Sequence, residues 1–456
     1  MRIPVEDASG YPGQADRWLA PASAEEAAAL LREASAAGIA VTPSGAGTGI
    51  TGGRCPAGGW VLSLEKFLRL EAGPETALAG AGVLLKDVQA AAARHGRFYA
   101  PDPTEWTASI GGNIATNASG SRSFRYGSTR RHVRAVTAAL MDGTVRTFRR
   151  GERLDFDYEP LPAPATTKNT AGYFLPPEAE WVDLFCGSEG TLGIVLETEL
   201  ELTKQPASVL SGVVFFPDDE AALAAVETWR GVPRLNMLEY MDEPSLVFLR
   251  GPYGGEIPRP ARACLMIEQE LDGLPGEPLD EWVERLEAAG ALEDSWFGET
   301  ARDRERFRAF RHTLPELVNA RVRQNGCQKL SSDFAVPLAR NGEMLAYYRE
   351  TLGRRFPGKF TIYGHIGDAH VHVNVLSESQ AGFEAGKEWM NEAAAQAVAL
   401  GGTVSAEHGL GKRKRHFLPL MFTPAQIEAM RAVKRRLDPL WLLSPGNLFP
   451  DPFVTC

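Results

Sequence analysis

Three histidines fall within eight residues of the segment 364–375, which reads GHIGDAHVHVNV. The chain has only 8 histidines, so three so close together are unusual. After a turn that follows His365, the two-residue period of a strand would place His370, His372 and Asn374 on one face. Histidine is the commonest nitrogen ligand for zinc, manganese and iron. The segment therefore predicts a metal site, and the alternative is a surface strand with polar decoration.

A carboxylate and another histidine are adjacent further along, in the segment SAEHGLGKRKRHF of residues 405–417. Glu407 could complete a site of two histidines and one carboxylate with positions left open for substrate, and His408 could serve as a nearby base. The run KRKR at 412–415 is most simply a solvated helix face, because acids are in excess elsewhere. We assign it no nucleic-acid role.

An arginine-rich helix is expected over residues 299–323, followed by Lys329 in the segment QKLSSDFAVP. Its arginines alternate with acids and aromatics, and they are Arg302, Arg304, Arg306, Arg308 and Arg311. Most of them are expected to form solvated i,i+4 pairs with Glu and Asp. A planar guanidinium also suits bidentate capture of a carboxylate, so one or two of them could bind an acidic substrate.

Three glycine-rich segments, each beside an expected strand, lie within the first ~200 residues. They are residues 43–53 (PSGAGTGITGG), 101–121 (PDPTEWTASIGGNIATNASGS) and 186–195 (CGSEGTLGIV). Glycine lets a backbone approach a ligand closely and direct several N–H groups at a phosphate. One such segment alone could be a tight connection, but three predict a large ligand such as a dinucleotide. The spacing is not the G-x-G-x-x-G of a Rossmann fold, which disfavours a nicotinamide cofactor.

Alternating helices and strands are expected to carry these segments. Residues 21–42 predict a helix that begins with a Ser23–Glu26 capping box and ends at Gly38, followed by a strand. Residues 84–95 predict a second helix, and residues 101–121 a loop that wraps the ligand. From about residue 206 to 404, apolar strands alternate with charged helices in an α+β pattern, and residues 405–456 read as helical.

Bulk properties exclude several classes of protein. A chain of 456 residues is too long for one hydrophobic core, and 44% hydrophobic with 23% charged residues indicates a globular protein without a membrane span. The net charge of −10 argues against nucleic-acid or anionic-membrane partners. The five cysteines are scattered without a C-x-x-C pair, which excludes a cysteine-held zinc or iron–sulfur centre. The start, MRIPVEDASG, does not read as a signal peptide, so we expect a cytoplasmic protein.

Taken together, the motifs resemble the FAD-linked D-2-hydroxy acid dehydrogenases, the D-lactate, D-2-hydroxyglutarate and glycolate dehydrogenase group of the vanillyl-alcohol oxidase superfamily. Six motifs carry the resemblance in order from about residue 15 to 450: PSGAGTGITGG, PDPTEWTASIGGNIATNASG, GSEGTLGIV, GHIGDAHVHVN, SAEHGLGK and SPGNLFP. It implies an α+β fold with a two-subdomain FAD-binding domain over residues 1–205. It also implies a ferredoxin-like α+β substrate domain over residues 206–404 and a helical segment over residues 405–456 that packs back on the FAD domain.

The resemblance also implies the cofactor-binding residues. Around the pyrophosphate these are Pro43, Ser44, Gly45, Ala46, Gly47 and Thr48; around the flavin and its linker, Pro103, Thr104, Gly111, Gly112, Asn113, Thr116, Asn117, Ser119 and Gly120; and elsewhere, Glu189, Gly190, Gly193, Ile194, Val195 and Asn447. No histidine lies in the first two glycine-rich segments, so FAD is expected to be non-covalent. Ser44 and Asn447 stand where many relatives carry Arg and Lys, which removes one phosphate contact and one charge.

The chemistry that the resemblance implies uses a divalent metal, zinc, manganese or iron, on His365, His372 and Glu407. His408 matches the catalytic base, and Arg311, Lys329 and Asn374 match substrate-binding positions. The metal would acidify the substrate hydroxyl, His408 would take its proton, and the α-hydrogen would pass as hydride to the flavin. Pro315 occupies a place where hydroxyglutarate-type enzymes are expected to present a Thr.

We therefore expect oxidation of a D-2-hydroxy acid, a monocarboxylate of the D-lactate kind, to the 2-oxo acid. The alternatives are a D-2-hydroxyglutarate or glycolate dehydrogenase, a phenol or alcohol oxidase, a non-catalytic flavin-binding subunit of a larger redox complex, and a metal-dependent hydrolase without flavin. The sequence leaves open the electron acceptor, which could be a quinone, a cytochrome, an electron-transferring flavoprotein or oxygen. It also leaves open whether the chain forms a homodimer.

Overall fold

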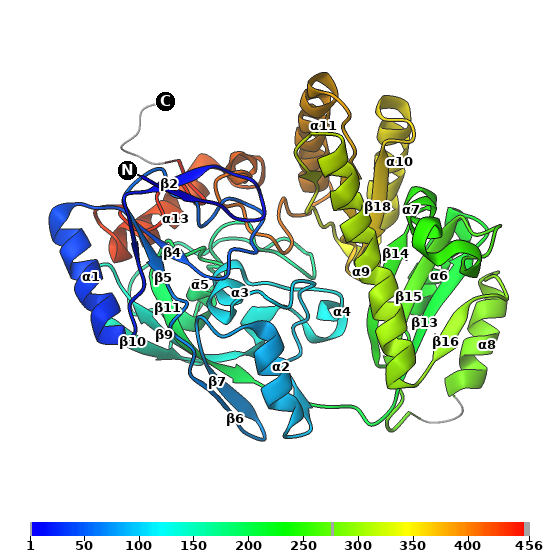
Figure 1. The fold of residues 1–456 in the computed structure, drawn as a ribbon, viewed down its shortest axis with the longest axis horizontal. Coiled ribbons are helices and arrows are strands. Elements are labelled where there is room, and N and C mark those ends of the chain that lie inside the picture. The colour runs from blue at the N-terminus through cyan, green and yellow to red at the C-terminus, as the bar shows by residue number, and fades with distance from the viewer. Residues whose placement is uncertain (1, 275–277, 451–456) are drawn as a thin grey trace.

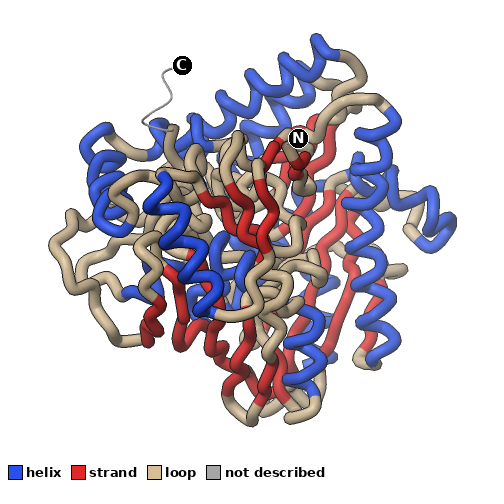
Figure 2. The backbone as a smooth tube through the Cα atoms, turned by 60° about the vertical axis from the view of Figure 1, so that its left-hand side comes forward, coloured by secondary structure: helices blue, strands red, loops and turns tan. Residues whose placement is uncertain are grey.

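Two lobes make up the molecule in the computed structural model, which describes residues 2–274 and 278–450. In Figure 1 the first lobe lies on the left and the second on the right, and the C-terminal segment after about residue 404, drawn orange to red, leads back to the left. Figure 2 shows strands through the interior of both lobes, with most helices on the outer faces. The α+β class predicted from the sequence is confirmed. In the described residues, no helix is long and apolar enough to cross a membrane.

The first lobe contains a parallel and an antiparallel sheet. The parallel sheet has the order β3-β5-β4, with β3 (Arg17–Leu19), β5 (Trp60–Ser63) and β4 (Val41–Ser44). The antiparallel sheet has the order β10-β9-β11-β7-β6, with β10 (Val145–Arg149), β9 (Val133–Ala139), β11 (Ile194–Glu201), β7 (Thr76–Gly80) and β6 (Leu70–Ala72). Two short ribbons pair β1 (Ile3–Val5) with β2 (Gly13–Ala15) and β12 (Thr203–Lys204) with β8 (Arg97–Phe98).

Helices of the first lobe connect these strands. They are α1 (Ala24–Ala37), α2 (Leu85–Ala93), α3 (Ile110–Thr116), α4 (Ser123–Tyr126) and α5 (Trp181–Phe185), with a 3-10 turn η1 (Thr129–His132). The hydroxyl of Ser23 accepts the Glu26 N–H at 3.2 Å, but the Glu26 carboxylate accepts from Ala22, so the expected capping box forms only in part. Gly38 ends α1 with φ +63°, as its position predicts. The segment 101–121 is not a loop throughout, because α3 lies inside it.

A seven-stranded antiparallel sheet forms the centre of the second lobe. Its order is β16 (Trp296–Gly298), β13 (Val209–Phe216), β15 (Ala263–Glu270), β14 (Leu235–Met241), β18 (Phe360–Gly364), β19 (His372–Val375) and β17 (Leu330–Ser331). Its helices are α6 (Asp219–Trp229), α7 (Glu243–Tyr253), α8 (Pro278–Ala288), α9 (Ala301–Gln324), α10 (Asn341–Arg355) and α11 (Gln380–Ala399), with 3-10 turns η2 (Gly254–Glu256), η3 (Leu338–Arg340) and η4 (Ile366–Asp368). The arginine-rich segment forms α9, as expected.

The C-terminal segment returns to the first lobe. It contains η5 (Arg415–Phe417), α12 (Leu418–Met421) and α13 (Pro424–Leu437), so much of the stretch expected to be helical consists of turns. Leu443 forms a parallel bridge with Val41 beside the three-stranded sheet. Residues 451–456, including Cys456, lie outside the described residues, and the four described cysteines are free thiols.

Ion pairs beside α4 tie the two lobes together. The Arg122 guanidinium donates to both carboxylate oxygens of Glu268 on β15, at 2.8 and 2.9 Å. Arg125 pairs with Glu270 on the same strand at 2.9 Å. The side chain of Glu268 is only 9% exposed, and Arg122 supplies its counter-charge.

Replacing Arg122 by Met should therefore lower the free energy of unfolding by about 2–3 kcal/mol, because it leaves a nearly buried carboxylate without its cation. Urea unfolding of the FAD-loaded protein measures the change. The matched control is Arg134→Met, since the Arg134–Glu201 pair is 42% and 49% exposed and should contribute less than about 1 kcal/mol. If both variants lost the same free energy of unfolding, the Arg122–Glu268 pair would not stabilise the contact between the lobes.

Candidate active site

A cofactor cavity of about 170 Å³ lies in the first lobe, between the glycine-rich segments. Fifteen of the residues implied by the family resemblance line it: Pro43, Gly45, Ala46, Gly47, Thr48, Gly111, Gly112, Asn113, Thr116, Glu189, Gly190, Gly193, Ile194, Val195 and Asn447. Pro103, Thr104 and Ser119 line the neighbouring catalytic pocket instead. Ser44, Asn117 and Gly120 line neither cavity, since Ser44 and Asn117 are buried and the Gly120 carbonyl accepts from Lys168.

Close packing of neighbouring residues against the backbone explains two of the glycines around this cavity. A Cβ on Gly45 would lie 2.2 Å from the Ser109 hydroxyl, which accepts the N–H of Ala46 at 3.2 Å. A Cβ on Gly111 would lie 2.7 Å from that of Ala81, where α3 meets the end of β7. Side chains at either position would push the segments apart and change the walls of the cavity.

Charges missing from two family positions are supplied by other residues. Arg54 lines the cofactor cavity and donates to the Gly45 carbonyl at 3.2 Å, close to the place where Ser44 lacks a guanidinium. Asn447 receives a hydrogen bond from the Lys412 ammonium at 2.7 Å. The expectation that the charge at position 447 is simply absent is therefore corrected, because Lys412 brings an ammonium to this point.

Glu189 joins the third glycine-rich segment to the C-terminal segment. Its carboxylate accepts the N–H groups of Leu410 and Gly411 at 2.8 and 2.7 Å. Burial raises the pKa of Glu189 to about 7, against these hydrogen bonds and the charge of Lys412. Asn447 donates to the Glu189 carbonyl at 3.2 Å, so residues on both sides of the second lobe in sequence close one cavity.

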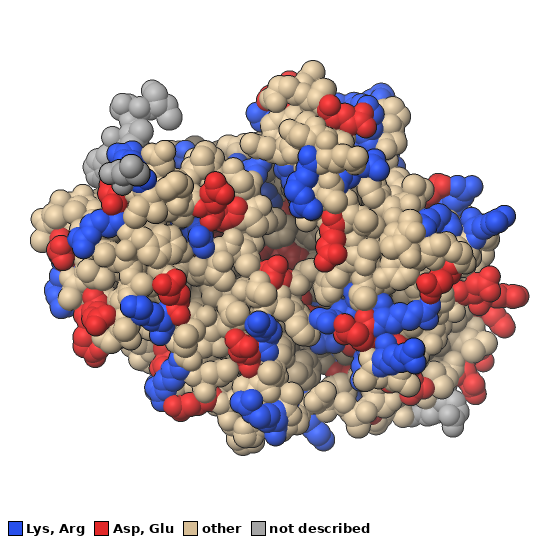
Figure 3. Space-filling model, viewed as in Figure 1, with Lys and Arg blue, Asp and Glu red and all other residues tan. Residues whose placement is uncertain are grey.

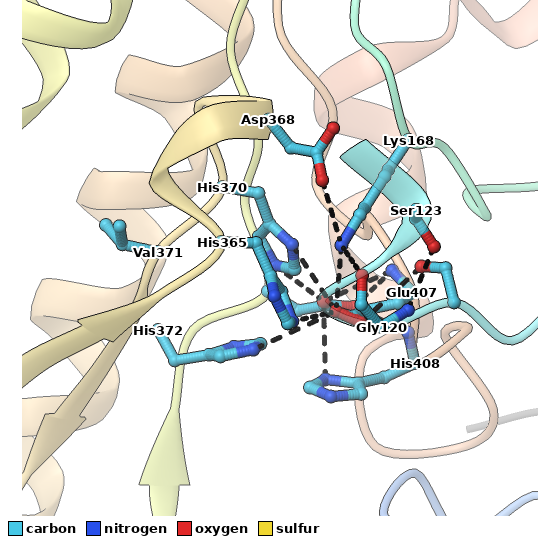
Figure 4. Close-up of polar contacts among 12 residues, drawn as sticks. Gly120, Ser123, Lys168, His365, Asp368, His370, Val371, His372, Glu407 and His408 are labelled. Carbon is cyan, nitrogen blue, oxygen red and sulfur yellow. Dashed lines mark hydrogen bonds and ion pairs between the residues drawn. The ribbon is translucent and has the colours of Figure 1, made fainter. Parts of the chain in front are cut away.

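The predicted metal ligands meet where the two lobes face each other (Figure 4). Ligand atoms of His365, His370, His372 and Glu407 all lie within 4.8 Å of one another. The Glu407 carboxylate is at the centre: its Oε1 is 2.7 Å from His365 Nε2, 3.5 Å from His370 Nδ1 and 4.0 Å from His372 Nε2. We call these four residues the histidine cluster.

His370 is the member that the sequence did not assign as a ligand. The strand begins only at His372, so the expectation that His370 lies on its face is wrong; Ala369, with φ +50°, and an isolated bridge to Ala335 position it instead. Its ring is fully buried, 3.2 Å from Asp333 and 3.5 Å from Glu407, yet neither ring nitrogen has a partner with hydrogen-bond geometry in the described structure. An imidazole left without hydrogen bonds beside two more and a carboxylate fits a divalent metal.

Electrostatics hold two members of the cluster, Glu407 and His372, in metal-binding forms. In contrast, Glu239 and Glu407 raise the pKa of His365 against the effect of burial, so His365 would release a proton when a metal binds. Burial alone would raise the pKa of Glu407, but the charges of His365 and Lys168 outweigh it and hold this pKa well below its usual value. Burial and the neighbouring histidines, His370 first, lower the pKa of His372 well below its usual value. The carboxylate is thus ionised and this imidazole neutral, which are the forms that bind metals.

Three residues behind the cluster were not found from the sequence. Glu239, on β14, accepts from Arg311 at 2.7 Å and contacts His365 Nδ1 at 2.5 Å. Lys168, which comes from the first lobe, lies 3.4 Å from Glu407 and 3.3 Å from Asp368. Asp333 accepts the N–H of His408 at 2.9 Å. For Glu239, the sequence offered one signal of a functional role, which is that this residue is the single acid in an otherwise largely apolar strand.

His408 lies under the histidine cluster in the catalytic pocket, a cavity of about 260 Å³. Its Nδ1 is 3.3 Å from Asp333 Oδ1. Burial lowers the pKa of His408 to about 4, although Asp333 opposes the shift. The imidazole is therefore neutral near pH 7 and able to accept a proton.

Most of the predicted substrate-binding residues line the same pocket. Arg311 and Lys329 do, together with Pro315. Asn374 does not line it: the residue is buried on β19, opposite Thr361, and its amide has no hydrogen bond among the described residues. The pocket therefore combines cations for a carboxylate, a neutral imidazole and a histidine cluster next to the cofactor cavity.

Comparison with known proteins identifies the family. A family model described as "FAD linked oxidases, C-terminal domain" matches residues 205–448, and one described as "FAD binding domain" matches residues 15–149. The chain belongs to the FAD-linked oxidases. Within this family it is 33% identical to a D-lactate dehydrogenase of Archaeoglobus fulgidus, with 94% of this chain and 90% of the relative covered.

Other FAD-linked oxidases place the chain in the predicted group. A D-2-hydroxyglutarate dehydrogenase of Xanthomonas citri pv. viticola is 32% identical over 94% of this chain and 88% of its own. The glycolate oxidase subunit GlcD of Bacillus subtilis is 30% identical over 96% and 90%. The chain is thus an FAD-linked oxidoreductase of the D-lactate, D-2-hydroxyglutarate and glycolate group, which confirms the resemblance.

A solved structure supports the fold of this family member. Alkyldihydroxyacetonephosphate synthase superposes with a TM-score of 0.66 at 16% identity, covering 94% of this chain and 76% of the other. Together with the match to an FAD binding domain, this superposition confirms the predicted FAD fold of the vanillyl-alcohol oxidase type.

Proposed function

We propose that the chain oxidises a D-2-hydroxy acid, a monocarboxylate of the D-lactate kind, to the 2-oxo acid. One observation carries the proposal: a single pocket beside the FAD loops is lined by three members of the histidine cluster, the neutral His408 and two cations, which are His365, His372, Glu407, His408, Arg311 and Lys329. When bound, FAD accepts the α-hydrogen of the substrate as a hydride. A quinone, a cytochrome or an electron-transferring flavoprotein would then take up the electrons.

His365, His370, His372 and Glu407 would hold a divalent metal, zinc, manganese or iron. Such an ion would stabilise negative charge on the substrate hydroxyl and so lower its pKa. Glu239 fixes the ring of His365 from behind, and Lys168 keeps the Glu407 carboxylate in place from the first lobe. The support of ligands by outer partners is what metal sites generally require.

His408 would accept the proton of the substrate hydroxyl. Asp333 positions it by accepting the backbone N–H at 2.9 Å, and Asp333 Oδ1 also lies 3.3 Å from Nδ1, without hydrogen-bond geometry. This arrangement leaves Nε2 as the ring nitrogen available to the pocket, and Asp333 would stabilise the imidazolium that forms. Asp333 is therefore a positioning residue.

Arg311 and Lys329 would hold the substrate carboxylate so that C2 is correctly oriented. The Arg311 guanidinium is itself fixed by Glu239 at 2.7 Å and lies 3.2 Å from Thr104 Oγ1. Pro315 follows one turn later on α9 and lines the pocket without a hydroxyl, which favours a monocarboxylate over a longer diacid.

The affinity for substrate should fall above about pH 8. Burial, and after it the charge of Lys414, lowers the pKa of Lys329 to about 8, so the ammonium is charged below this pH and neutral above it. We expect kcat/KM to decline about tenfold per pH unit above pH 8, since this ratio reports the free enzyme. In Lys329→Arg the guanidinium stays charged, and the decline should disappear. An unchanged decline in that variant would assign it to another group.

Anaerobic mixing with D-lactate, D-2-hydroxyglutarate and glycolate, followed at the flavin absorbance band, tests the function itself. D-lactate should bleach the flavin fastest. Yellow protein that none of the three acids reduces would instead indicate a non-catalytic flavin-binding subunit.

A further inference from the structure

A second cavity, of about 410 Å³, adjoins the catalytic pocket and is lined by five cationic side chains. They are Lys329, Lys387, Lys412, Arg413 and Lys414, and none of the described residues that line it is Asp or Glu. The chain as a whole has a net charge of −10, so a lining of one positive sign is unlike its average surface. In Figure 3 the surface is hollowed between the lobes, and Lys and Arg side chains gather beside the upper part of the hollow. We call this space the basic cavity.

The basic cavity lies where five parts of the chain meet, one of which is the single residue Ile50. Its other walls come from residues 8–11, from β17, from α11 and from residues 412–417. Ile50, Lys329 and Ser331 line both this cavity and the catalytic pocket. Lys329 therefore stands at the boundary between the two spaces.

Two of the five cations form no hydrogen bond or ion pair among the described residues, although the charges of Asp333, Glu189 and Glu407 act on one of them, Lys414. Lys387 pairs with Glu384 at 2.8 Å, Lys412 donates to Asn447, and Arg413 donates to the Ser9 carbonyl. In contrast, the buried Nζ of Lys414 has no hydrogen-bond partner in the described structure. Lys329 likewise forms no ion pair or hydrogen bond with any residue in the described ranges 2–274 and 278–450.

Two ammonium groups buried near each other, those of Lys329 and Lys414, are unfavourable in their charged forms. Burial lowers the pKa of Lys414 and of Lys329, and the charge of Lys414 adds to the effect on Lys329. A buried cation without a partner is stabilised strongly by any oxyanion that enters, because the anion supplies both charge and hydrogen-bond acceptors. A cavity this large also exceeds what the carboxylate of a lactate-sized substrate needs.

We infer that the basic cavity binds a small oxyanion, a carboxylate or phosphate group, between Lys329 and Lys414, with Lys387 and Arg413 nearer its mouth. The anion has two sources of the same chemistry. It is either the remote acid group of a substrate that extends past Lys329, or a separate small anion that occupies the cavity beside the substrate. The first source rests on the proposed oxidation of a 2-hydroxy acid but requires a diacid in place of the monocarboxylate, whereas the binding site itself depends on neither.

Calorimetric titration of the FAD-loaded protein with inorganic phosphate, at constant ionic strength, tests the site without turnover. We expect saturable binding that Lys387→Glu weakens about tenfold through the reversed charge. The matched control is Lys359→Glu, because Lys359 and Lys387 are both 51% exposed and ion-paired, at 2.7 and 2.8 Å, but only Lys387 lines the cavity. Lys414→Met should abolish the binding of phosphate. If Lys414→Met does not fold, the Lys387→Glu variant still tests the site. Absence of phosphate binding, or wild-type affinity in Lys387→Glu, overturns the inference.

Flavin reduction by two acids separates the sources. If the remote group of a substrate occupies the cavity, phosphate competes with D-2-hydroxyglutarate only, and Lys387→Glu raises KM about tenfold for this acid but not for D-lactate. If a separate anion binds, phosphate alters reduction by both acids without competing with either. Competition with both acids alike would place the phosphate in the catalytic pocket and overturn the second site. If neither acid reduces the flavin, the proposed function fails, while the phosphate titration still decides the cavity.

Discussion

Replacing His408 by Asn is expected to slow the reduction of the flavin by substrate about 10³-fold and to leave FAD bound. Asparagine can keep the backbone contact with Asp333 but cannot accept the proton from the substrate hydroxyl. His408 is not among the residues that line the cofactor cavity, so FAD should remain in place. Anaerobic stopped-flow mixing, read at the flavin absorbance band, measures the rate.

The control for this variant is His95→Asn, which makes the same change at an exposed histidine of the first lobe. Substrate should reduce the flavin of this variant at the wild-type rate. If His408→Asn is also reduced at that rate, another group takes the proton, and His408 has only a structural part.

Glu407→Gln should remove the bound divalent metal and lower kcat/KM by about 10³-fold or more, because the metal would lose its only anionic ligand in the histidine cluster. The fold should survive, since the Lys168 ammonium keeps Asp368 at 3.3 Å as its counter-charge. Elemental mass spectrometry of the purified protein gives the metal content, and steady-state turnover gives kcat/KM.

Two further measurements complete this test. Glu388→Gln should change neither the metal content nor kcat/KM, because the side chain of Glu388 is 73% exposed on the surface of α11. Removing the metal from the wild-type protein with a chelator and restoring zinc, manganese or iron separately identifies the ion that supports turnover. Full activity without metal would leave the cluster a purely structural feature.

Local patterns account for the parts of the site that the sequence predicted. Glycine content marked the cofactor loops because neighbouring side chains pack directly against the glycine backbone, as Ser109 does at Gly45, and exclude any larger residue. His365, His372 and Glu407 were recognisable by residue type and by the motifs that surround them. Both signals lie within a few residues of the feature that they predict.

The residues that the sequence missed act through long-range contacts. Glu239 reaches His365 across 126 residues, and Lys168 reaches Glu407 across 239. His370 was misplaced because the left-handed residue Ala369 delays the start of the strand. The ammonium beside Asn447 belongs to Lys412, which lies in a different segment of the chain. A comparison of motifs position by position does not show such a contact.

The cofactor cavity is built from residues that lie far apart along the chain, and this bears on how the protein is made. The amide of Asn447 donates to the Gly53 carbonyl across 394 residues, so the walls of the cavity meet only after the whole segment between these two residues has been synthesised. Contacts of such high contact order form slowly, because their loops must close first. Loading of FAD should therefore be a late event in biosynthesis, and free flavin during expression should raise the yield of folded protein by mass action.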